Sequence, residues 1–316
     1  MVPKADSTTG RSKMDYRGLG KTSLQVSSIG MGCVTFGREI DEETAFGVMD
    51  HAIGKGITLF DTAEAYAAGA SEQALGNWIG SRGTRDDIVL ATKVAGDDLT
   101  ADRVVASAEE SLGRLGVDTI DLFQVHNWTD AVPVDDTMGG LNRLVEQGKA
   151  RYVGCSNYDG AQLEQALNAC EAGGFARLES VQPNYNLVTR EIEGDVLPLC
   201  EEREIGVISY SPLGAGFLTG KYRKGGEVPA GTRFDVIPGH QDIYFNDENF
   251  DRMEKLRVVS EREGRSMIQL ALAWVIGQPG ISSVLVGARS LGHIDQAFEA
   301  EATGLSEDLR NELSGL

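Results

Sequence analysis

The feature that most constrains this fold is an alternation along the 316-residue chain of short apolar, β-rich runs with stretches of helical periodicity. Runs that are apolar on both faces are typical of parallel strands covered by helices on both sides. Eight parallel strands with helical crossovers predict an α/β fold, a (β/α)8 TIM barrel. The expected strands are residues 28–31, 57–60, 88–91, 120–125, 150–154, 179–181, 206–209 and 283–286.

Helical patterns follow or separate these runs, and several have capping signals. Ser71 is expected to cap a helix that ends at residue 78, and Thr100 one that ends at residue 115. Further helices are expected over residues 42–53, 136–146, 248–263 and 266–276. The segment of residues 212–250 is long and rich in Gly and Pro, and so long a loop in a compact domain is usually functional.

The amino-terminal part of the chain predicts two further features. Residues 15–27, with GLGKTS at the turn, are expected to form a β-hairpin that closes the barrel floor. Residues 1–13 carry charges but no apolar stretch, so we expect a flexible tail rather than a secretory signal. No Pro-, Ser- or charge-rich linker divides the rest, which predicts a single barrel domain over residues 14–316.

Composition excludes several classes of partner. With 29 basic and 48 acidic residues, the net charge of −19 repels nucleic-acid backbones and anionic lipid. The longest apolar run, residues 268–276, is too short to span a bilayer. The four cysteines form no CxxC pair, which favours reduced thiols in a cytoplasmic protein. The four histidines are scattered, so no metal site is expected.

A polar residue stands at the carboxyl end of nearly every expected strand. In a barrel these ends meet at one rim, which is where barrel enzymes have their active sites. A series of this kind is hard to explain as solvation, so the pattern predicts one site. Its members are Asp61, Lys93, His126, Ser156 with Asn157, Gln182, Ser211 and Arg289.

Four of the residues near the first strand ends could supply the proton that the reduction of a carbonyl group by a hydride requires. A phenol has a pKa of about 10, and a nearby ammonium lowers it, so Lys93 could make Tyr66 a better acid. Asp61 could hold Lys93, and His126 could orient the substrate oxygen. Taken singly, Tyr66 could instead be an apolar residue of the barrel mouth, the Asp61–Lys93 pair structural and His126 a core histidine.

Several motifs in a fixed order make the chain resemble the aldo-keto reductase superfamily, from about residue 15 to residue 297. The later motifs are most similar to those of the sugar-reductase and potassium-channel β-subunit branch. The motifs are LQVSSIGMGCVTFG, FDTAEAYAAGASEQALG, VLATKV, LFQVHNW, GKARYVGCSNY, SVQPNYNL, VISYSPLGAGFLTGKY and VLVGARS.

The resemblance implies a catalytic tetrad of Tyr66, Lys93, Asp61 and His126, with NADPH as cofactor and a small carbonyl compound as substrate. Trp128, and with it Phe36, would shape the substrate pocket. The adenine side departs from the family pattern, because His293, Gln296 and Ala297 replace the usual Gln, Glu and Asn. The implied cofactor contacts are Thr35, Phe36, Asp61, Ser156, Asn157, Gln182, Tyr210, Ser211, Pro212, Leu213, Gly214, Lys221, Arg233, Gly287 and Arg289.

We therefore expect an NADPH-dependent oxidoreductase in which Tyr66 is the general acid. The alternative is a cofactor-bound regulatory or redox-sensing protein with little turnover, and a third is an epimerase or dehydratase on the same barrel. The complete tetrad, with His126, favours the enzyme. Neither a GxGxxG near the amino terminus nor a Tyr-x-x-x-Lys occurs, which argues against Rossmann and short-chain dehydrogenases. The motifs do not specify the substrate, the physiological direction or the oligomeric state.

Overall fold

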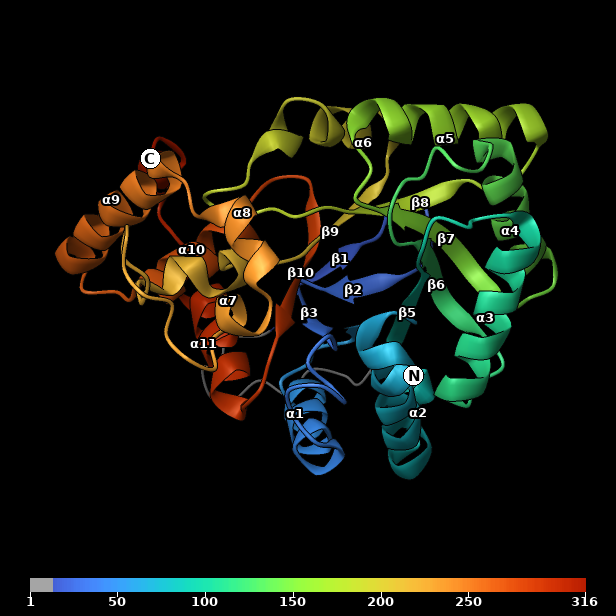
Figure 1. Ribbon diagram of the computed structural model, residues 1–316, viewed down its shortest axis with the longest axis horizontal. Helices are drawn as coiled ribbons and strands as arrows, with labels where there is room; N and C mark the ends of the chain where they lie inside the picture. The colour runs from blue at the N-terminus through green and yellow to red at the C-terminus, as the bar shows by residue number, and fades with distance from the viewer. Residues whose placement is uncertain (1–13) are drawn as a thin grey trace, which may run out of the picture.

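Eight parallel strands close into a barrel in the order β10-β3-β4-β5-β6-β7-β8-β9, as the alternation predicts (Figure 1). The structure is a computed structural model that describes residues 14–316; the tail expected over residues 1–13 lies outside them. The strands are β3 (Ile29–Gly32), β4 (Leu59–Asp61), β5 (Val89–Val94), β6 (Ile120–Val125), β7 (Ala150–Ser156), β8 (Leu178–Gln182), β9 (Gly206–Ser209) and β10 (Ile281–Gly287).

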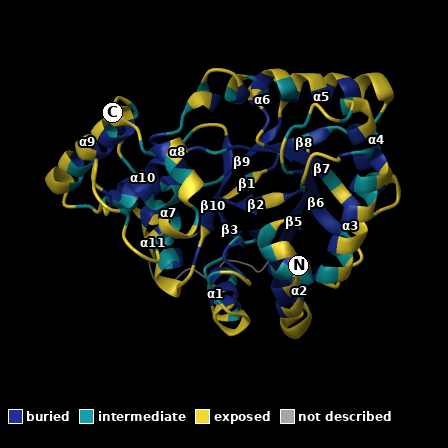
Figure 2. Ribbon diagram, in the orientation of Figure 1, coloured by how far each residue is buried: buried dark blue, intermediate teal, exposed yellow. Residues whose placement is uncertain are grey.

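Helices surround the barrel, with their buried faces turned to the strands and their exposed faces outward (Figure 2). Two short helices, α7 (Arg233–Val236) and α8 (Gln241–Tyr244), belong to the long segment after β9. Among residues 14–316, no helix has the length and apolar character needed to cross a membrane. The main helices are α1 (Glu42–Gly54), α2 (Ala70–Arg82), α3 (Ala101–Leu115), α4 (Val134–Glu146), α5 (Gly160–Gly173), α6 (Val196–Arg203), α9 (Asp247–Glu263), α10 (Met267–Ile276), α11 (Leu291–Thr303) and α12 (Glu307–Ser314).

The expected cap at the start of α2 is wrong. The helix begins at Ala70 after Gly69, whose φ is 89°, so Ser71 lies inside the first turn. Its hydroxyl donates to the carbonyl oxygen of Cys33 (2.8 Å) and lies 2.9 Å from that of Thr62. A tertiary contact therefore uses the hydroxyl that sequence reasoning assigned to capping. The helix expected over residues 266–276 is confirmed as α10, and Ser266 forms a capping box at its start.

A hairpin closes the floor at the amino ends of the strands, as predicted. Its strands are β1 (Tyr16–Gly18) and β2 (Gln25–Ser27), which pair antiparallel. Leu19, Leu24 and Val26 are buried against inward-facing side chains of the barrel, such as Leu59 and Ile208.

The hairpin is also bonded to late parts of the chain. Arg17 donates to the carbonyl oxygens of Ile276 (3.0 Å) and Ile281 (2.9 Å). At Gly20 φ is 55°, and a Cβ would lie 2.4 Å from the carbonyl oxygen of Glu179, so only glycine fits there. The floor therefore leaves the carboxyl ends of the strands as the accessible rim.

Candidate active site

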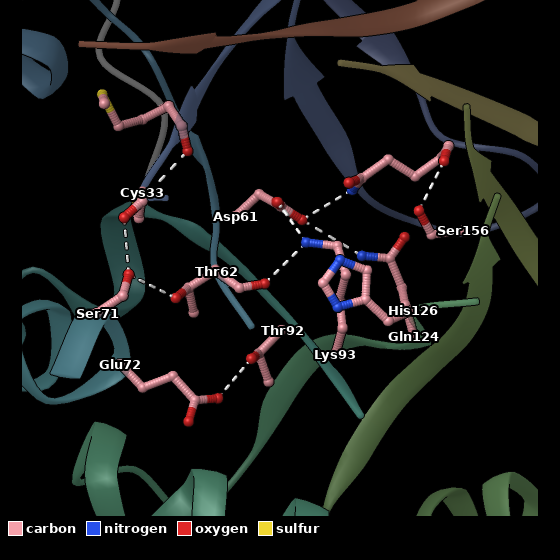
Figure 3. A network of polar contacts seen from close by, with 12 residues as sticks. Cys33, Asp61, Thr62, Ser71, Glu72, Thr92, Lys93, Gln124, His126 and Ser156 are labelled. Carbon is pink, nitrogen blue, oxygen red and sulfur yellow. Dashed lines mark hydrogen bonds and ion pairs between the residues drawn. The ribbon is translucent and has the colours of Figure 1, made fainter. Parts of the chain in front are cut away.

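A fully buried ion pair lies at the centre of the rim (Figure 3). The Nζ of Lys93 donates to Oδ2 of Asp61 (2.6 Å) and to the carbonyl oxygen of Thr62 (2.8 Å). Oδ1 of Asp61 accepts from the side-chain amides of Gln182 (2.8 Å) and Gln124 (3.4 Å). Burial disfavours the ammonium, but Asp61 and Tyr66 outweigh it and raise the pKa of Lys93. Lys93 is therefore a fixed positive charge.

Tyr66 lies close to both this charge and His126. Nζ of Lys93 is 5.2 Å from the centroid of the phenol ring, and the ring meets that of His126 edge to face, with centroids 5.6 Å apart. Burial raises the pKa of Tyr66, and Lys93 lowers it by less, while Asp61 raises it further. Lys93 therefore lowers the pKa of Tyr66, as the sequence predicts, but burial and Asp61 together raise it by more. The phenol consequently keeps its proton at neutral pH.

His126 is a neutral ring at the cavity. Burial, and then the charge of Lys93, lower its pKa to about 3. A neutral imidazole has one donor and one acceptor nitrogen. Nδ1 is buried and has no hydrogen-bond partner among the described residues. The ring can therefore give one hydrogen bond to a guest without bringing a charge.

The chain directly after Tyr66 adopts a strained conformation. Ala67, Ala68 and Gly69 have φ values of 51°, 51° and 89°, three left-handed residues in succession. For residues other than glycine, this conformation costs roughly 1–2 kcal/mol each. No periodicity signals such a turn, and sequence reasoning missed it.

A cavity of about 500 Å³ opens at the rim and contains most of the predicted site residues. Four others, Phe36, Gly214, Trp128 and Lys93, lie outside its lining. Phe36 is fully buried, Gly214 is buried beside the ring of Tyr244, and Trp128 packs on Tyr158 and donates to Asp130. The predicted residues in the lining are Thr35, Asp61, Tyr66, His126, Ser156, Asn157, Gln182, Tyr210, Ser211, Pro212, Leu213, Lys221, Arg233, Gly287 and Arg289. Lys93 lies beneath the lining, behind Asp61 and Tyr66.

Apart from His293 and Gln296, which the sequence places on the adenine side, sequence reasoning assigned no role to the other lining residues. A group of them comes from the segment around α7, where the only signal was the length of the loop. They are Gly32, Val34, Arg38, Glu39, Ala215, Gly216, Thr219, Val236, Ile237, His240, Leu272, Leu285, Val286, His293 and Gln296.

Near Asp61 the cavity presents amide and hydroxyl groups. The amide nitrogen of Gln182 faces Asp61, so its oxygen is left as an acceptor. Asn157, with φ 57°, donates to the carbonyl oxygen of His126 (2.9 Å) and accepts from the hydroxyl of Tyr210 (2.7 Å). Ser156 donates to the carbonyl oxygen of Gln182 (2.7 Å). These groups suit a flat polar ring that bears a carboxamide.

At the other end the cavity is cationic. Lys221 and Arg289 both line it, and neither pairs with a carboxylate within residues 14–316. Burial, and then the charge of Arg289, lower the pKa of Lys221. Two cations without a carboxylate fit an anionic guest. Arg233 differs, because its guanidinium pairs with Glu39 (2.5 Å).

The backbone and the adenine-side residues complete this end. Ser211, Gly214, Ala215 and Gly216 all have positive φ, so the chain after β9 curls tightly beneath the cavity. Such strain gathers at ligand sites. Of the residues that depart from the family pattern, His293 and Gln296 line the cavity, whereas Ala297 is buried. Nδ1 of His293 accepts the backbone N–H of Arg289 (3.2 Å).

The sequence is similar to known proteins over almost its whole length. The family model described as Aldo/keto reductase family matches residues 28–315. The chain is 34% identical over 314 residues to aldo-keto reductase YhdN of Bacillus subtilis, covering 94% of this chain and 92% of the relative. It is 31% identical over 300 residues to a probable voltage-gated potassium channel subunit beta of Arabidopsis thaliana, 91% of each. Protein tas of Escherichia coli is 30% identical over 339 residues, 96% of this chain and 97% of the relative.

Proposed function

Because this chain belongs to the aldo/keto reductase family, we propose that it is an oxidoreductase that reduces an aldehyde or ketone to an alcohol with NADPH. One observation carries the proposal: Tyr66 lies close to the buried Lys93–Asp61 pair and beside His126, in the lining of one cavity. This arrangement supplies a proton at a single point of a cavity that suits an anionic cofactor.

In the proposed reaction, the four residues protonate and orient the carbonyl oxygen, two of them directly and two through Tyr66. The nicotinamide, when bound, supplies the hydride to the carbonyl carbon. Tyr66 gives its proton to the oxygen as the double bond becomes a single bond, so the product is an alcohol. Lys93 stabilises the phenolate that remains, and Asp61 holds Lys93 in place. His126 donates a hydrogen bond that orients the oxygen.

The donor groups of the cavity suit NADPH at each of its ends. Ser156, Asn157 and Gln182 would bind the carboxamide, with Tyr210 against the nicotinamide ring. The curled backbone from Ser211 to Gly214, with Lys221 and Arg233, would hold the pyrophosphate. Gly287 and Arg289 would meet the adenosine phosphate, for which an arginine fork is well suited.

The experiment is a panel of aldehydes, ketones and matching alcohols followed by NADPH absorbance, with wild type and Tyr66→Phe. Loss of an acid catalyst lowers rate by about two to four powers of ten. The affinity for NADPH should be unchanged, because the ring remains. Turnover of Tyr66→Phe close to the wild-type value would show that the proton comes from elsewhere.

A second candidate is a cofactor-bound regulatory protein with little turnover. The observation that favours it is the similarity to the probable potassium channel subunit beta. Rapid multiple turnover of an added carbonyl would select the enzyme. Tight binding of NADPH with almost no turnover would select the regulatory protein.

A further inference from the structure

The loop that carries Tyr66 is closed at its base. The hydroxyls of Thr62 and Ser71 lie 2.9 Å apart, and that of Ser71 also donates to the carbonyl oxygen of Cys33, the residue after β3 (Figure 3). Between these points the backbone turns through the three left-handed residues that follow Tyr66. A turn that alanine avoids persists only where its surroundings restrain it.

The first restraint lies on the amino-terminal side of Tyr66. Oε1 of Glu64 accepts from the backbone N–H of Ala95 (2.7 Å) and from Arg103 (2.7 Å), and Oε2 accepts from the hydroxyl of Ser107 (2.6 Å). Burial opposes the charge, but these bonds hold the pKa of Glu64 below its ordinary value. Arg103 and Ser107 both belong to α3, so the carboxylate ties the loop to that helix.

The second restraint lies on the other side. Glu72, in the first turn of α2, is fully buried; it accepts from the hydroxyl of Thr92 (2.5 Å) and from Nε of Arg114 (2.6 Å). Arg114 is the last arginine of α3. Its side chain also packs on the left-handed turn, because a Cβ at Gly69 would lie 2.8 Å from its Cδ. Figure 3 shows the bond from Thr92 to Glu72.

We propose that Glu64 and Glu72 are positioning residues, which tie the loop on both sides of Tyr66 to α3 and so hold the phenol against Lys93 and His126. Neither carboxylate lines the cavity, so each acts through the loop and not on the substrate. The inference rests on the proposed function, in which Tyr66 gives the proton. A displaced proton donor is costly, since a misplacement of about 1 Å can lower a rate by roughly a hundredfold.

The test uses Arg103→Gln and Arg114→Gln, which weaken each tie from its helix end, together with Glu64→Gln. Both arginine side chains are partly exposed, so their replacement opens no cavity in the core. In Arg114→Gln the buried carboxylate of Glu72 keeps the bond from the hydroxyl of Thr92. Arg143→Gln is the matched control, because Arg143 of α4 forms an exposed ion pair with Asp102 of α3, the helix that also carries Arg103 and Arg114. Three quantities are measured on the full chain: kcat and KM with the best carbonyl, the Kd for NADPH, and hydrogen exchange of residues 62–72.

We expect kcat of the three variants to fall by about tenfold or more, with KM and the NADPH Kd little changed. Exchange of residues 62–72 should become faster, and the basic limb of the pH–rate profile should move upward as the phenol leaves Lys93. The control should match wild type in every measurement.

Two results would overturn the inference: exchange and kcat like wild type in both arginine variants, or a fall in kcat without faster exchange of the loop. If Glu64→Gln does not fold, the arginine variants decide alone. If wild type reduces no carbonyl compound, the proposed function fails. Exchange then still decides whether the two carboxylates restrain the loop.

Discussion

Replacement of Lys93 by methionine tests how strongly the site depends on its buried ion pair. Lys93 and Asp61 are both almost inaccessible, and the change removes two donated bonds, to Asp61 and to the carbonyl oxygen of Thr62. Loss of one partner of a buried pair typically costs about 3–5 kcal/mol, because an uncompensated charge remains. Asp61 keeps the bond from Gln182. We therefore expect a loss of about 3 kcal/mol, at the lower end of that range.

The double variant Asp61→Asn/Lys93→Met separates pairing from packing. With both charges gone, no charge is left alone, so the double variant should lose less than the sum of the single ones. A coupling of about 2–3 kcal/mol is expected for groups in direct contact. The exposed pair of Lys149 with Glu109 offers a matched control, since Lys149→Met should cost about 1 kcal/mol or less.

The measurement is equilibrium urea unfolding, followed by tryptophan fluorescence and by far-ultraviolet circular dichroism. Trp78 and Trp274 are fully buried, so unfolding changes their surroundings. The two probes must give the same transition for a free energy of unfolding to be defined. Strict additivity of the single variants would refute the reasoning, because it would mean that Lys93 and Asp61 contribute independently.

Three further predictions follow from named contacts. The pKa of His126 is about 3 in the folded state and about 6.5 in the unfolded state, so the unfolded state binds more protons between these values. The free energy of unfolding should therefore fall by about 2 kcal/mol from pH 7 to pH 5, and urea titrations of His126→Gln should show that this loss is removed. Arg289→Ala should lower the affinity for NADPH by about one to two powers of ten and hardly change the affinity for NADH, as measured by titration of both cofactors. Equal affinity of wild type for the two cofactors would contradict the proposed role of the arginine. Gly20→Ala should lower the free energy of unfolding by about 2–4 kcal/mol, because a Cβ would meet the carbonyl oxygen of Glu179. Gly148 also has a positive φ but lies in open space, so Gly148→Ala should cost about 1 kcal/mol, and equal costs would mean that the contact at Gly20 is unimportant.

The position of a residue at a strand end was the most informative sequence signal. Asp61, Lys93 and Gln182 meet at the rim because parallel strands of a barrel all point the same way, so a polar residue after a buried run has one place to go. The rule needs only the end of each strand. It therefore tolerates errors of a few residues, such as β5 continuing to Val94 where the apolar run suggested residue 91.

Other features depend on contacts that no local pattern records. Ser71 looks like a cap, but the left-handed Gly69, two residues earlier, is the cap of α2, and the hydroxyl of Ser71 bonds to the carbonyl oxygen of Cys33, just after β3. Trp128 is expected to shape the substrate pocket, yet its ring packs on Tyr158 and does not line the cavity. The direction of the Tyr66 pKa likewise depends on burial, which the sequence motif cannot reveal.

The hairpin at the barrel floor has a consequence for how the protein is made. A chain synthesised from its amino terminus produces β1 and β2 first, but the groups that seat them come from β8, β9 and β10. Arg17 must wait for a carbonyl group 264 residues further along, at Ile281. Contacts of such sequence separation form slowly, because a long loop has to close before any of them is gained. The apolar edge of β3 likewise has no β10 to cover it until translation is almost finished. Closure of the barrel and sealing of its floor should thus be late, joint events, and a ribosome-bound chain is most prone to aggregate in the interval before them.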